Sequence, residues 1–160
     1  FEKSERVLDS VAVSPVRPLE YVLSKLLSIA LISTAIAAVI GACGGFVSDY
    51  AGFLLSVFFC SCLFSAVGLI FAASAESLNE FIIITIPAEL LINIPAIAYI
   101  FGYKRDWLLF HPGVCMIELC SNGQNKLISA VVIIIWTVLF TVMANRAVEK
   151  MLKSVGGVKL

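Results

Sequence analysis

Four long apolar blocks constrain this chain more than any other feature of its sequence. Each is close to the length of about 20 mostly apolar residues that a helix needs to cross a bilayer. The chain is 61% hydrophobic and only 14% charged, whereas about a quarter of the residues of a soluble domain are charged. The sequence therefore predicts an all-α integral membrane protein with four transmembrane helices, spanning about residues 26–47, 50–75, 81–102 and 127–144.

The basic residues predict on which side of the membrane each end lies. The ends carry Lys3, Arg6, Arg17, Lys25, Arg146, Lys150, Lys153 and Lys159, whereas the loop before the last span carries Lys104, Arg105 and Lys126. Cytoplasmic segments hold the excess of Lys and Arg. We therefore expect a multi-pass protein of the cell membrane with both ends in the cytoplasm and a long external loop, in which residues 114–119 form a short helix.

The segment before the first span predicts a separate cytoplasmic element. Residues 2–13 read as a short amphipathic helix whose apolar residues, Val7, Leu8 and Val11, share one face. Ser14-Pro15 ends this helix, because a residue that precedes proline avoids the helical region. Pro18 then occupies a favoured first-turn position. The chain divides into this element with its proline corner, residues 1–17, and a transmembrane domain with a basic cytoplasmic tail, residues 18–160.

The third span contains the polar residues that most suggest a binding site. Pro87 and Pro95 each remove a backbone donor from the helix. Glu89 and Asn93 lie between them, one turn apart and on one face. A carboxyl inside a span is costly and suggests a function, so these two residues are candidates for substrate binding. The alternative is a protonated Glu89 that bonds Asn93 or a freed carbonyl and holds the kink together.

The remaining polar residues and cysteines support no catalytic or metal site. No phosphate-binding GxxxxGK[ST] loop, HExxH or GxSxG is present. His111 is the sole histidine, and Glu118 near it reads as a surface residue. Cys115 and Cys120 in the external loop are either paired in a disulfide or two reduced thiols, and we favour the reduced form. The few basic residues give no support to nucleic-acid binding.

The first 25 residues resemble the cytoplasmic element of type-2 ABC-transporter permeases, most closely the fluoroquinolone-export subgroup. That element has an acidic start, a Leu/Val-rich stretch, a Ser/Thr-Pro and a helix ending in Ser/Gly-Lys. The matching residues are Glu2, Glu5 and Arg6, then Val7-Leu8, Ser14-Pro15-Val16, Glu20-Tyr21 and Ser24-Lys25. Val7-Leu8 stands where the wider class usually has Gly-Thr. The remaining chain agrees in layout, with a proline-broken third span.

The resemblance implies a dimerising permease that separate ATP-binding subunits drive, so ATP and Mg would bind the partner and this chain would need no cofactor. Since it begins with Phe1, we expect it to be part of a longer protein and to supply helices three to six of six. The short helix would contact the ATPase through Glu5, Arg6, Asp9 and Ser14. We therefore expect a non-enzymatic permease subunit of an exporter for drug-like or amphiphilic molecules.

Two other functions fit the same residues. A membrane scaffold or accessory subunit would use Glu89 structurally, and a proton-coupled transporter would use its carboxyl to carry protons. Recovery of an ATPase subunit with the protein would distinguish the first alternative from the exporter. Transport that responds to a pH gradient without ATP would identify the second.

Overall fold

The computed structural model describes residues 17–45, 47, 49–121 and 123–155. The predicted cytoplasmic helix, with Glu5, Arg6, Asp9 and Ser14, lies outside the described residues. The helices that the structure describes therefore all belong to the predicted transmembrane domain, which begins at Pro18.

Within the described residues the chain forms four long helices and a shorter pair. The long helices are α2 (Pro18–Gly44), α3 (Tyr50–Ser74), α4 (Leu78–Ile100) and α6 (Lys126–Val155). The shorter pair, η1 (Asp106–Phe110) and α5 (Pro112–Cys120), lies between α4 and α6. All four long helices are long and apolar enough to cross a membrane. The predicted helical class and number of spans are confirmed.

Local sequence signals explain where the helices begin and end. Pro18 begins α2, and the Glu20 carboxylate accepts a hydrogen bond from the Arg17 N–H at 3.3 Å. The helix stops at Gly44, before the predicted end of the span, because Gly45 adopts a left-handed backbone with φ of 62°. By contrast, α6 contains no glycine or proline, so it continues past residue 144 through the basic residues to Val155.

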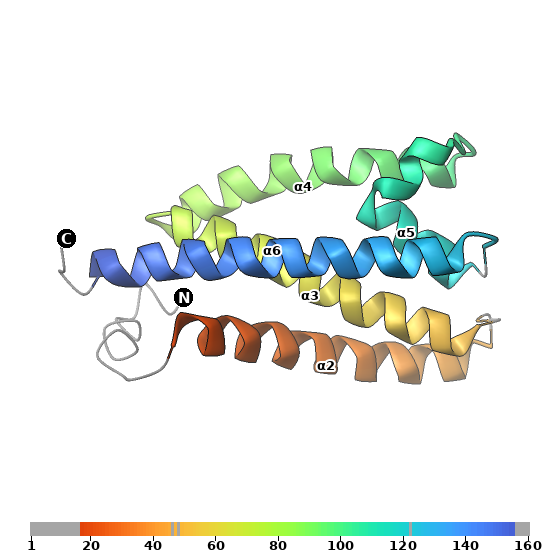
Figure 1. Cartoon of the computed structure of the whole chain (residues 1–160), viewed down its shortest axis with the longest axis horizontal. Coiled ribbons are helices and arrows are strands. Elements are labelled where there is room, and N and C mark those ends of the chain that lie inside the picture. The colour runs from red at the N-terminus through yellow and green to blue at the C-terminus, as the bar shows by residue number, and fades with distance from the viewer. Residues whose placement is uncertain (1–16, 46, 48, 122, 156–160) are drawn as a thin grey trace.

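The helices α2, α3 and α6 form a bundle with an apolar core near the end where α2 begins. Its buried residues come from all three helices: Val22, Leu26, Ala66, Ala144, Val148 and Met151. In Figure 1, α2, α3 and α6 lie side by side while α4 stands apart along much of its length, in agreement with its packing chiefly on α3 and α5. The bundle is therefore the scaffold and α4 a more loosely attached helix.

Small residues let α3 approach its neighbours closely. Gly52, Ser56 and Cys60, spaced four residues apart, are all buried. A Cβ on Gly52 would lie 2.9 Å from the backbone oxygen of Leu119 in α5. These contacts give the small residues on this side of α3 a packing role.

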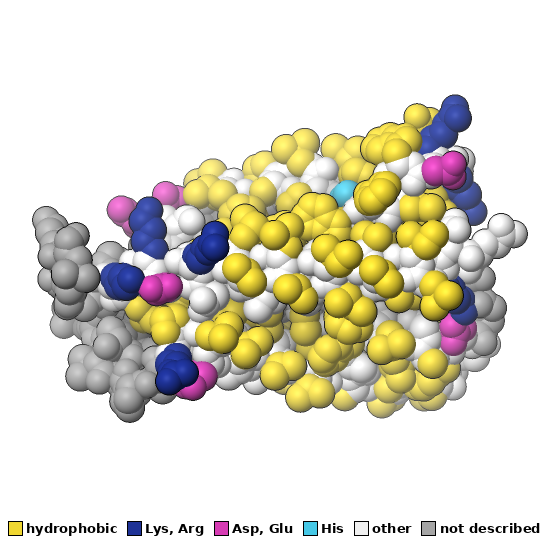
Figure 2. All heavy atoms as spheres, in the orientation of Figure 1, with side chains coloured by type: hydrophobic (Ala, Val, Ile, Leu, Met, Phe, Trp, Pro, Cys, Tyr) yellow, Lys and Arg dark blue, Asp and Glu magenta, His cyan; other side chains and the backbone are white. Residues whose placement is uncertain are grey.

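The surface has the pattern of a bilayer-spanning protein. Figure 2 shows hydrophobic side chains over the middle of the molecule and charged side chains gathered at its two ends. One end holds the beginning of α2 and the end of α6, and the other holds η1, α5 and the beginning of α6. We call them the terminal end and the α5 end. An apolar belt between two charged ends matches a hydrocarbon layer between two aqueous faces.

Candidate functional site

The predicted pair Glu89 and Asn93 lies on α4 between its two prolines. The Asn93 side-chain amide donates a 2.8 Å hydrogen bond to the backbone carbonyl of Glu89, not to its carboxylate. Glu89 is exposed, Asn93 is half-buried, and the described residues offer the Glu89 carboxylate no hydrogen bond or ion pair. The structure thus places the pair one turn apart, as predicted, but does not contain the proposed bond between carboxyl and amide.

Glu89 lies on nearly the same side of α4 as the residues that face its neighbours. Residues four and seven apart share one side of an α-helix, because a turn contains 3.6 residues. Thr85 and Ala96 stand at these spacings from Glu89, and both are buried. Glu89 between them is exposed. Other parts of the chain therefore cover this side of α4 at Thr85 and at Ala96 but leave it open between them, where the Glu89 carboxylate lies.

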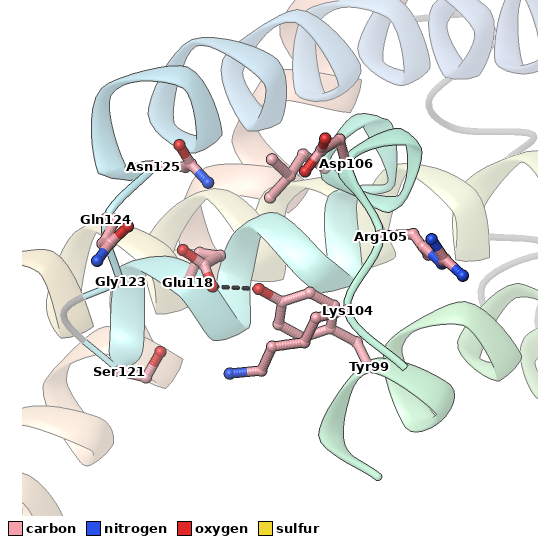
Figure 3. Close-up of a pocket in the computed structure, with 10 residues that line it drawn as sticks. Tyr99, Lys104, Arg105, Asp106, Glu118, Ser121, Gly123, Gln124 and Asn125 are labelled. Atoms are coloured by element: carbon pink, nitrogen blue, oxygen red, sulfur yellow. Dashed lines mark hydrogen bonds between the residues drawn. The ribbon is translucent and has the colours of Figure 1, made fainter. Parts of the chain in front are cut away.

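The α5 end contains a buried polar pair that the sequence did not indicate. The Tyr99 hydroxyl at the end of α4 donates a hydrogen bond to Oε1 of Glu118 in α5, as Figure 3 shows. Glu118 is only 6% exposed, so its interpretation as a surface residue was wrong. The spacing from Val114 and Cys115 to Glu118 was the available signal, because all three share the buried side of α5.

A polar cavity of about 460 Å³ opens beside this pair. Its lining comes from the end of α4, from η1 and α5 and from the segment that leads to α6, and it includes Tyr99, Lys104, Arg105, Asp106, Glu118 and Asn125. The Nζ of Lys104 lies 5.5 Å from the centre of the Tyr99 ring. Figure 3 shows the Tyr99–Glu118 hydrogen bond among these lining residues. The cavity therefore presents both acidic and basic groups to whatever occupies it.

His111 and the two loop cysteines have structural partners around α5. The Nδ1 of His111 accepts a 3.2 Å hydrogen bond from the Gly113 N–H and so caps α5. The Cys115 thiol donates to the Leu109 carbonyl at 3.0 Å, whereas the Cys120 sulfur lies 2.9 Å from the Ser56 hydroxyl. Both cysteines are free, and burial raises the pKa of Cys115 to about 11. The structure thus has the reduced thiols that we favoured.

An ion pair joins the beginnings of α3 and α6. Asp49 caps α3 by accepting a 3.1 Å hydrogen bond from the Gly52 N–H. The Lys126 ammonium donates to the same carboxylate. The hydrogen bond from Lys126, together with that from Gly52, lowers the pKa of Asp49. Among the described residues no group of three or more His, Cys, Asp or Glu could hold a metal ion.

Comparison with known proteins identifies a family. The model of a family described as ABC-2 type transporter matches residues 1–94, which include Glu89 and Asn93. No curated protein and no solved structure matches the chain. A membrane domain of this family is a transport component that is not itself catalytic, and the family in general implies an ATP-binding partner subunit and permease dimerisation. With four apolar helices and a match over more than half its length, the chain belongs to the ABC-2 type transporter family and is a multi-pass membrane permease.

Proposed function

We propose that this permease is the membrane-spanning subunit of an ATP-driven exporter for drug-like or amphiphilic molecules, related to the fluoroquinolone-export subgroup. The observation that carries the proposal is the exposed Glu89 carboxylate on an apolar helix of an ABC-2 permease. A charged group facing lipid is costly, so intramembrane carboxylates normally face a protein interior or a watery path. A second permease subunit against the open side of α4 would place Glu89 on such a path.

The chemistry of this position favours cationic or zwitterionic cargo. The carboxylate attracts a positive group, and Asn93 one turn away remains half-buried beside it. Large exposed apolar side chains surround the pair on α4, among them Ile86, Leu90 and Ile97. An amphiphile could therefore place its charged group at Glu89 and its apolar part against these side chains.

The distribution of charge supports a cytoplasmic terminal end. Among the described residues this end carries Arg17, Lys25, Arg146, Lys150 and Lys153, whereas the α5 end carries Lys104, Arg105 and Lys126. This bias agrees with the positive-inside rule. In the proposed orientation α5 and its cavity face outward, and cargo leaves the membrane at the α5 end.

The test of the substrate site is Glu89→Gln in the complete transporter with its ATPase subunit. This change removes the charge and keeps the shape, so we expect ATP-driven efflux of a cationic or zwitterionic amphiphile to fall at least about tenfold. Glu80→Gln is the matched control, because Glu80 lies on the same helix but bonds the Glu76 N–H at 2.8 Å in the first turn. Equal efflux by wild type and Glu89→Gln, with the same substrate profile, would refute the site.

ATP coupling has a separate test at the cytoplasmic segment. We propose that Glu5, Arg6, Asp9 and Ser14 contact the ATPase subunit, which would hold ATP and Mg. Charge reversal at Glu5 and Arg6 together should abolish co-purification of the ATPase subunit with the permease, or stimulation of its ATPase activity by the permease. Intact assembly and ATPase activity would contradict the coupling role.

A pH-gradient response without ATP would instead support proton coupling through Glu89, and absence of transport altogether would support a scaffold.

A further inference from the structure

Helix α5 is attached to the bundle by apolar packing. Its Cys115 and Leu119 are buried together with Ile133 of α6, and Phe59 of α3 packs against the same cluster. The hydroxyl of Ser56 and the sulfur of Cys120 add a 2.9 Å contact between α3 and α5. Separating α5 from the bundle would expose this apolar surface and open a packing defect. The structure therefore makes α5 a fixed part of the scaffold.

Helix α5 meets α4 in a different way. The contacts on α4 are Ile92, Ala96 and Tyr99, which lie four and three residues apart and so share one side of the helix. The imidazole of His111 faces the carbonyl of Ile92. A Cβ on Gly113 would lie 3.0 Å from that of Ala96. Two of the three contacts are polar, and their groups can bond water when the helices separate.

The third contact is the Tyr99–Glu118 pair, and it adjoins the polar cavity. Both residues line that cavity, so water can reach the hydroxyl and the carboxylate when the bond between them opens. The ring of Tyr99 also packs with Leu108 and Val114, and it is the single residue of α4 in this cluster of buried residues. Release of α4 from α5 therefore moves one aromatic ring and exchanges the Tyr99–Glu118 hydrogen bond for bonds to water.

The backbone of α4 can bend within this contact, between Ile92 and Ala96. Pro95 lies directly before Ala96 and removes the hydrogen bond to the carbonyl of Leu91. Proline is a common cause of helix kinks. The part of α4 beyond Pro95 can therefore change its direction relative to the part that carries Glu89 and Asn93.

We propose that the α4–α5 contact is a latch that opens and closes in each transport cycle, with Tyr99 and Glu118 as positioning residues that hold α4 closed against α5. The inference rests on the proposed function, and in that orientation the latch lies at the outer face. When closed, it blocks cargo that has reached Glu89. When open, α4 swings about Pro95 and cargo leaves.

The test is a reversible lock, the double variant Ala96→Cys with Gly113→Cys. The Cβ of Ala96 and a Cβ at Gly113 would lie 3.0 Å apart, slightly less than the Cβ separation of about 3.5–4.5 Å in disulfides, so a small shift allows the bond. In the complete transporter, we expect oxidation to reduce ATP-driven efflux of a cationic amphiphilic dye at least about tenfold and a reductant to restore it. Efflux that continues at the same rate with the disulfide formed would overturn the latch.

A matched control locks α5 to the bundle instead. Ser56→Cys faces the native Cys120, so oxidation would join α3 to α5. Because this contact stays closed in the proposed cycle, efflux should be unchanged. Loss of efflux in both locked proteins would also contradict the proposal, since α4 would then not be the helix that moves. Oxidised single variants control for the native cysteines.

The wild-type transporter provides a second measurement that needs no substitution. Trapping the ATPase in its ATP-bound state should raise amide hydrogen exchange in residues 96–100 and 112–115 at least about tenfold, while 116–120 stays protected. Unchanged exchange at both segments would reject the latch. If the wild type shows no ATP-dependent efflux, the proposed function fails; if efflux occurs and the lock does not affect it, only the latch fails.

Discussion

The three-helix bundle and α4 consist of helices that are all apolar enough to cross a membrane, yet they are held in different ways. In the bundle, side chains from α2, α3 and α6 share one buried cluster. In α4 the buried residues are confined to Thr85, Ala96 and Tyr99. How much of a helix is buried against its neighbours, rather than its hydropathy, therefore distinguishes a fixed helix from one that can move in a membrane protein.

The strongest test of this comparison is to make the same substitution, Leu to Ala, in the bundle and on α4. Leu26 in the bundle is 2% exposed and Leu91 on α4 is 68% exposed. Leu26→Ala should lower the free energy of unfolding by about 2–5 kcal/mol, because it leaves a cavity in a packed core. Leu91→Ala should change it by less than about 0.5 kcal/mol. SDS titration of the purified chain in detergent measures both, and equal losses would show that α4 is packed as firmly as the bundle.

A smaller effect is expected where α4 meets α5. Tyr99→Phe keeps the ring but removes the donor to the buried Glu118, which should destabilise this contact by about 1–3 kcal/mol. Amide hydrogen exchange in residues 96–100 and 112–115 should rise accordingly. Tyr103→Phe is the control, because Tyr103 is 52% exposed and its ring, which the substitution keeps, lies beside the Arg105 guanidinium. Equal effects of the two substitutions would show that the Tyr99–Glu118 hydrogen bond does not stabilise this contact.

A weaker and pH-dependent effect is expected for the ion pair that joins α3 to α6. Lys126→Met removes the partner that lowers the pKa of Asp49 from its ordinary 3.8. A carboxylate with a lowered pKa adds stability above about pH 3.8 and loses this contribution as pH falls through its folded value. The wild type should therefore have a higher melting temperature than Lys126→Met at pH 6 and a smaller advantage at pH 3. An advantage that is the same at both pH values would exclude this carboxylate as its source.

The sequence predicted what depends on local pattern. The apolar blocks predicted four spans, and Pro18 marked where α2 begins. The short helix predicted over residues 114–119 is present as α5 and begins two residues earlier, at Pro112. Contacts between distant residues were missed, because Tyr99 and Glu118 are 19 residues apart and Asp49 and Lys126 are 77 apart. Their pairing depends on how helices pack, which hydropathy does not report.

In the candidate site, too, the sequence predicted the local geometry but not the contacts with distant residues. The proline spacing and the helical repeat placed Glu89 and Asn93 on one face, and the structure agrees. The exposure of Glu89 depends on which neighbouring helices reach α4, so the sequence left its environment open. The contacts proposed for Glu5, Arg6, Asp9 and Ser14 remain predictions, because these residues lie outside the described part of the chain.

The smallest expected effect concerns the cap of α5, which borders the movable helix. Burial lowers the pKa of His111 from its ordinary 6.5, and the Ile92 carbonyl offsets part of this change. The unfolded chain therefore binds more protons than the folded chain between pH 6.5 and the lower folded value, so stability falls as pH decreases through this range. Protonation of Nδ1 would also remove the acceptor for the Gly113 N–H.

His111→Asn isolates this effect, because Asn also caps helices well and does not titrate. At pH 7.5 we expect the unfolding free energies of wild type and variant to differ by only a few tenths of a kcal/mol. At pH 5 the wild type should have lost more stability, and its hydrogen exchange in residues 112–115 should have increased more. Parallel pH profiles for the two proteins would mean that His111 does not couple pH to this end of α5. The latch would then respond to cargo and ATP alone.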